Sequence, residues 1–256
     1  MRQLLAFGKK EWMELVRTGK FWILLAVFFL FGVMNPAIAK LTPWMLESMA
    51  DSLQGTGLIV QEVEVNAMTS WTQFYKNVPL APIIFVVMSG TILTAEYQSG
   101  TLICVLTKGL DRWKVLAAKG FVMLGTWTIC YFLCFGVTYG YNVWFWGNEG
   151  IPSVFFGAGC VYLFGVWCLA MVLFWSALLK TGTSVLLSVG GVYLLCYLFS
   201  LIPRIKSYLP AWLMSAGQLL NGMGGAEDFW KAIIVTCVSA MTCMAAAVVM
   251  FDKREI

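Results

Sequence analysis

The polar residues best suited to chemistry lie between two apolar runs, from Glu96 to Gly120, in the stretch EYQSGTLICVLTKGLDRWKVLAAKG. A carboxylate begins this stretch, a Ser-Gly-Thr break follows, and Asp111 opens a helix whose first-turn amides its carboxylate can cap. Four basic residues follow closely: Lys108, Arg112, Lys114 and Lys119. We interpret the stretch as a docking surface for a partner protein. A solvated helix end beside a topogenic basic cluster is the alternative.

The composition indicates the kind of fold that carries this surface. Of 256 residues, 60% are hydrophobic and 12% are charged, about half the charged fraction of soluble domains. A chain of this length cannot hide so much apolar surface in a soluble core, so we predict an all-α polytopic membrane protein. Histidine is absent, which excludes a triad with a histidine base and any histidine-ligated metal.

Six apolar runs are long enough to span a bilayer, and together they form a single predicted transmembrane domain over residues 1–256. Pro36 is expected to kink or end the first of them. Residues 2–19 form a basic amphipathic helix suited to lie in the headgroup plane. The predicted spans cover residues 21–39, 78–95, 120–141, 153–179, 183–202 and 230–251, with a cytoplasmic loop over 96–119.

A further apolar stretch, within residues 203–229, is too short to span the bilayer and too apolar for an ordinary loop. A re-entrant or interfacial helical piece fits it best. Its end offers candidates for an outer gate hinged on glycine, and a plain flexible turn is the alternative. The candidate gate residues are Leu213, Leu219, Leu220 and Gly222.

The distribution of basic residues predicts the orientation. With both termini inside, twelve of the 17 lysines and arginines fall on the inner side and five on the outer side. Because inner loops of membrane proteins are enriched in these residues, we predict that both termini are cytoplasmic. Stable contact with the lipid bilayer follows, and nothing in the pattern indicates a nucleic-acid partner.

The predicted spans carry no charged residue at mid-depth. Ion-coupled transporters and voltage sensors need such groups, so these classes are disfavoured. The sequence also lacks the glycine-rich phosphate loop of ATPases. Uphill transport would therefore draw its energy from another subunit, bound through the one sizeable inner loop.

Four segments resemble the permeases of the ABC-2 class of ATP-binding-cassette transporters. KKEWMELVRTGKFWIL is similar to the family's N-terminal amphipathic helix, and NPAIAKLTPWMLE to the end of its first span. WTQFYKN resembles the start of the second span. AEYQSGTLICVLTKGLDRWKVLAAK resembles the coupling loop, although Gly-Leu-Asp stands where Pro and Ser commonly precede the arginine.

This resemblance implies that ATPase subunits dock on the coupling loop. The residues implied at that contact are Glu96, Gly100, Thr101, Leu102, Val105, Leu106, Lys108 and Arg112. Glu11, Trp12, Leu15 and Arg17 of the N-terminal helix would lie beside them.

The resemblance further implies two cytoplasmic ATPase subunits and a second permease copy, with a homodimer favoured over a heterodimer. Such a protein resides in the bacterial cell membrane. ATP and Mg would be bound by the ATPase partner, so no cofactor or metal is expected in this chain.

Three functions compete at this point. The first is the membrane subunit of an ATP-driven exporter, whose uncharged path between two permeases suits a hydrophobic or amphipathic cargo such as a peptide, toxin or lipid-like compound. The second is a non-transporting scaffold or sensor that binds a cytoplasmic partner through the same loop. The third, a membrane-embedded enzyme, is weakest because histidine and mid-membrane carboxylates are absent.

Overall fold

A computed structural model describes residues 2–53, 65–102, 107, 109–147, 150–222 and 224–253. These residues form helices and turns without any strand, and six of the helical segments are long and apolar enough to cross a membrane. The all-helical prediction is confirmed. The six segments are Lys20–Met45, Ala67–Ser99, Arg112–Phe145, Val154–Leu178, Gly182–Ser200 and Ala226–Lys253.

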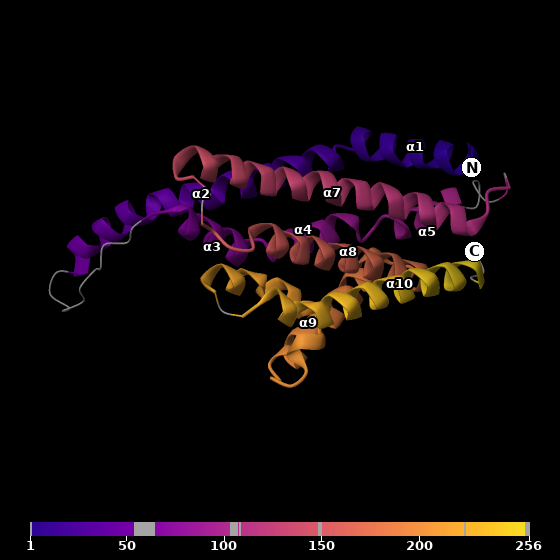
Figure 1. Ribbon diagram of the computed structural model, residues 1–256. Coiled ribbons are helices and arrows are strands. Elements are labelled where there is room, and N and C mark those ends of the chain that lie inside the picture. The colour runs from indigo at the N-terminus through magenta and orange to yellow at the C-terminus, as the bar shows by residue number, and fades with distance from the viewer. Residues whose placement is uncertain are drawn as a thin grey trace.

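The helices run alongside one another as an elongated bundle, with both termini at the same end (Figure 1). The α-helices are α1 (Arg2–Arg17), α2 (Lys20–Leu53), α3 (Ala67–Asn77), α4 (Leu80–Ser89), α5 (Thr94–Ser99), α7 (Arg112–Phe145), α8 (Val154–Leu178), α9 (Gly182–Ser200) and α10 (Trp230–Lys253). Three 3₁₀ segments precede α10: η1 (Lys206–Tyr208), η2 (Pro210–Asn221) and η3 (Ala226–Phe229).

Helix α2 corrects one prediction, because it continues through Pro36 to Leu53 and projects past the other helices (Figure 1). Proline has no amide hydrogen, so the carbonyl four residues earlier loses its helical donor. That carbonyl belongs to Gly32, and the Thr138 hydroxyl of α7 donates to it at 2.9 Å. The packed neighbour thus replaces the missing bond, and the helix does not end there.

The second span is divided into α3, α4 and α5. One break contains Pro79 and the other covers residues 90–93. At the second break Gly90 lies against α9, where an added Cβ would come 2.6 Å from the Leu186 side chain. The span predicted as one run over 78–95 is therefore a chain of short helices.

Helix α7 begins at Arg112, so the inner loop is shorter than the predicted 96–119 and its basic part is helical. Its 34 residues extend about 51 Å, well beyond a hydrocarbon core of about 30 Å. Asp111 occupies the N-cap position, but its side chain makes no capping bond. Its carboxylate pairs instead with the Lys114 ammonium at 2.6 Å, which corrects the predicted cap.

Aromatic packing holds the centre of the bundle. The indole of Trp127 in α7 packs on the rings of Phe28 and Phe85, at centroid distances of 5.8 and 5.3 Å. The benzene ring of the same indole meets α8 at Gly165, where an added Cβ would overlap it. A glycine is therefore required there for α7 and α8 to approach so closely.

Candidate functional site

A network of five charged side chains joins α1, α5 and α7 near the end of the bundle that carries both termini. The Lys119 ammonium lies 2.6 Å from Glu11 Oε2 and 3.2 Å from Glu96 Oε2. The second contact is an ion pair without hydrogen-bond geometry. All three side chains are less than 10% exposed, so each charge depends on the others for the stabilisation that water would otherwise give.

Lys10 closes the network from its exposed side. Its ammonium lies 2.9 Å from Glu11 Oε1, 3.0 Å from Glu96 Oε1 and 2.9 Å from Glu14 Oε2. Partial burial would lower the pKa of Lys10, but the hydrogen bonds to these three carboxylates raise it above its usual range. The hydrogen bond from Lys10 in turn lowers the pKa of Glu14.

The three carboxylates lie close enough for their oxygens to share one cation. The Lys10 ammonium already lies within 3.0 Å of all three. With two ammonium groups and three carboxylates, the network has a net charge of −1. The arrangement is therefore an ion-paired joint between helices, and the geometry assigns no metal to it.

The chain leaves this joint, after α5, through a left-handed turn. Helix α5 ends at Gly100, whose φ of 68° favours glycine. Beyond the turn Thr101 is exposed, whereas Leu102 is fully buried within the chain. Gln98 is exposed as well, and the docking role of Thr101 and Leu102 stays a prediction. Val105, Leu106 and Lys108 lie outside the described residues.

Arg112 also faces inward, toward the chain's own α10. Its guanidinium donates to the backbone carbonyls of Phe251 and Asp252 at 3.3 and 3.1 Å. A cation at the carbonyl end of a helix interacts favourably with the helix dipole. Arg112, predicted at the rim of a docking contact, therefore fastens the start of α7 to the end of α10.

Helix α1 runs along the first turns of α7 in the same direction (Figure 1). Lys114 donates to Gln3 at 3.2 Å, and Lys119 meets Glu11 about two turns further on. This orientation differs from a helix lying flat in the headgroup plane. The other predicted residues of the helix are placed by their neighbours: Trp12 packs on Phe21, Leu15 lines a small cavity beside α4, and Arg17 is exposed.

The predicted outer-gate residues lie in η2. Leu213, Leu219 and Leu220 are buried against the rest of the chain. Gly222 ends η2 in a left-handed conformation, with φ of 68°. The three leucines thus form core contacts of a single chain, and their gating role stays a prediction.

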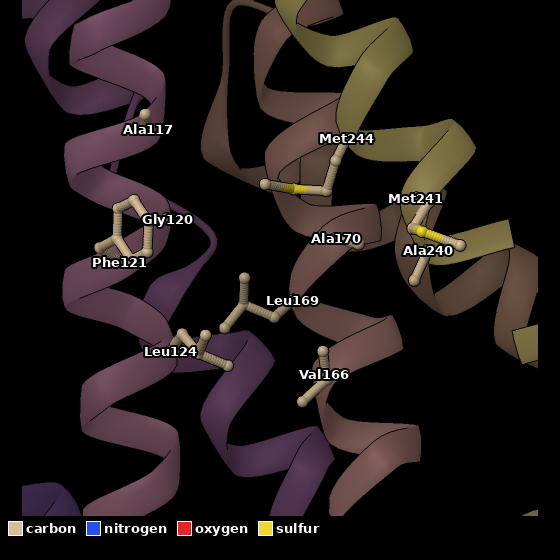
Figure 2. A pocket seen from close by; sticks show the side chains of 10 residues that line it. All are labelled: Ala117, Gly120, Phe121, Leu124, Val166, Leu169, Ala170, Ala240, Met241 and Met244. Carbon is tan, nitrogen blue, oxygen red and sulfur yellow. The ribbon is translucent and has the colours of Figure 1, made fainter. Parts of the chain in front are cut away.

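Two apolar grooves flank the exposed ring of Phe121 on α7. The first, the α7–α10 groove, has a volume of about 380 Å³. Figure 2 shows its lining of small, aliphatic and thioether side chains from α7, α8 and α10. The second, the α1–α7 groove, has a volume of about 530 Å³. It is lined by Leu4, Leu5, Gly8, Lys9, Trp12, Ala118, Phe121, Val122 and Gly125.

Sequence reasoning missed Lys10 and gave Lys119 only a topogenic role. Lys119 is the last charge before the uncharged part of α7, just as Glu96 follows the uncharged part of the preceding span. Opposite charges at the same ends of neighbouring spans are a signal of pairing. That signal was available in the sequence.

The comparison with protein families agrees with this architecture. The family described as ABC-2 family transporter protein matches residues 5–256. The chain belongs to the ABC-2 transporter family. No curated protein matches it. The permease is therefore a multi-pass membrane subunit of an ATP-binding-cassette transporter and associates with ATPase partners.

Proposed function

We propose that this permease is the membrane subunit of an ATP-driven exporter, and that its charge network carries the movement of docked ATPase subunits into the bundle. The observation that carries the proposal is the joint formed by Glu11, Glu96 and Lys119, which ties the segment leading to the coupling turn to α1 and α7. A force applied at the turn then moves three elements together.

The docking surface follows from which side chains are exposed beside that joint. Gln98 and Thr101 flank the Gly100 turn and face solvent. Glu96, Leu102 and Arg112 act from inside, because each is held by the permease itself. We therefore place the ATPase contact on the exposed side of the Gly100 turn. Glu96, Leu102 and Arg112, which the family resemblance placed in that contact, instead hold the turn from inside the permease.

The α7–α10 groove supports a hydrophobic or amphipathic cargo, such as a peptide, toxin or lipid-like compound. The α7–α10 groove is lined by ten residues without a charged or polar side chain. The translocation path would lie between two permease copies and would be lined by apolar side chains as well. The simplest assembly is a homodimer in a bacterial cell membrane, with both termini cytoplasmic.

The test is co-purification of the ATPase subunit with the tagged full-length permease in mild detergent. We compare the native chain with a Gln98→Glu, Thr101→Glu double variant, which places two charges that must be desolvated on docking at exposed positions and leaves the core untouched. Lys180→Glu, in the exposed turn before α9, is the matched control.

We expect the ATPase to be lost from the double variant and kept by the control. Equal recovery from all three would move the docking site elsewhere. If no ATPase accompanies the native chain, the scaffold or sensor function replaces the exporter.

A further inference from the structure

The α1–α7 groove combines apolar walls with one lysine, Lys9. Leu5 and Phe121 on its walls are 69% and 66% exposed. Lys9 is the charged member of the lining and has no ion-pair partner among the described residues. Its neighbour Lys10 is fully engaged in the charge network, so the two adjacent lysines have different environments.

Glycines keep the groove open on both walls. Gly8 of α1 and Gly125 of α7 both line it, and a Cβ added to either would meet no atom within 4 Å. At Gly165, by contrast, α7 closes onto the glycine. The groove volume of about 530 Å³ falls within the rough range of 300–1,000 Å³ typical of ligand sites.

We propose that the α1–α7 groove binds one anionic glycerophospholipid of the inner leaflet, with an acyl chain between Trp12, Phe121 and Gly125 and the phosphate on Lys9. A lysine can extend its apolar stem along an apolar surface and hold its ammonium at the level of the lipid headgroups. Lys9 lies two residues from Glu11, about 3 Å along the helix axis. It therefore lies at the level where the permease places its own charges.

An anionic lipid fits better than a zwitterionic one. The charges of the nearby network pair with one another and leave it with a net charge of −1. Lys9 is the charged residue that lines the groove itself, so its ammonium is the group placed to meet a phosphate there. A single lysine that meets an anionic headgroup gives an expected preference of about fivefold. The inference uses the inner-leaflet orientation proposed above, but its test does not require it.

Lipid retention by the full-length permease tests the proposal. The delipidated protein is incubated in detergent with equal amounts of phosphatidylglycerol and phosphatidylcholine, and native mass spectrometry counts the lipid retained. We expect about fivefold more phosphatidylglycerol on the native chain. Lys9→Gln should abolish the preference, and Gly125→Leu should reduce retention of both lipids because the leucine fills the groove.

Two controls separate this site from general lipid binding. Gly136→Leu adds the same side chain to α7 at an exposed glycine whose Cβ position is also open. Lys180→Gln removes a different exposed lysine. Both should behave as the native chain.

The proposal is overturned if the native chain shows no headgroup preference. It is also overturned if Gly125→Leu retains as much lipid as Gly136→Leu, or if Lys180→Gln loses the preference as Lys9→Gln does. The ATPase is absent from this assay, so a negative result leaves the exporter proposal unchanged.

Discussion

Replacing Lys119 by methionine tests the charge network most directly. Methionine keeps the length and the apolar stem of the side chain but removes the ammonium that lies between Glu11 and Glu96. Removing one partner of a buried pair costs about 3–5 kcal/mol, because a charge is left without compensation. Lys10 still contacts both carboxylates, so we expect a loss near the lower end, about 3 kcal/mol.

The assay is the free energy of unfolding in detergent, with denaturant as the variable. A loss of about 3 kcal/mol corresponds to a change of roughly a hundredfold in the unfolding equilibrium. A double-mutant cycle with Glu11→Gln separates the pair from other effects, because removing both partners leaves less uncompensated charge than removing one.

We expect the double variant to be more stable than the sum of the two single changes predicts. Lys119→Arg should retain most of the stability. If Lys119→Met costs less than about 1 kcal/mol, or if the cycle shows no coupling, the buried network does not hold these helices together.

Three further outcomes are expected. Gly165→Ala drives a methyl group into the packed indole and should destabilise the bundle by about 1–3 kcal/mol, whereas Gly159→Ala, whose Cβ position is open, should stay near native in a thermal melt. Because the pKa of Glu14 is lowered and that of Lys10 raised, their contribution to stability should be complete between their usual values, 4.5 and 10.5. It should fall as pH drops through the folded pKa of Glu14 or rises through that of Lys10. The protease sensitivity of α1 measures this loss, and a sensitivity that stays constant as pH is lowered step by step below 4.5 would contradict the prediction. Arg112→Gln should speed amide exchange at the end of α10 by weakening charge-assisted bonds, and identical exchange would show that these bonds are unimportant.

The sequence predicted the class of fold well because apolar run length is a strong signal in a membrane protein. It failed where one residue depends on a distant neighbour. Pro36 was expected to kink or end its helix, but the helix continues, because Thr138, about a hundred residues later in the chain, donates its hydroxyl to the carbonyl that Pro36 leaves without a donor.

The site was predicted only in part, for the same reason. Glu11 and Glu96 were identified through resemblance to a family. Their partner Lys119 was instead grouped with the basic residues of the inner loop, and no ion pair was predicted for it. Leu102 was expected on a docking surface because its apolar character suits insertion into a partner. The chain satisfies that preference internally, which no local pattern could reveal.

The charge network also constrains the order in which the chain can assemble. Glu11 and Lys119 are separated by 108 positions, and both carboxylates that contact Lys119 are synthesised before it. At a ribosomal speed of roughly 5–20 residues per second, α1 waits about 5–20 s for this partner. Until Lys119 is made, Lys10 is the only lysine of the network available to its three carboxylates, so α1 can take its final place only once the start of α7 has been synthesised.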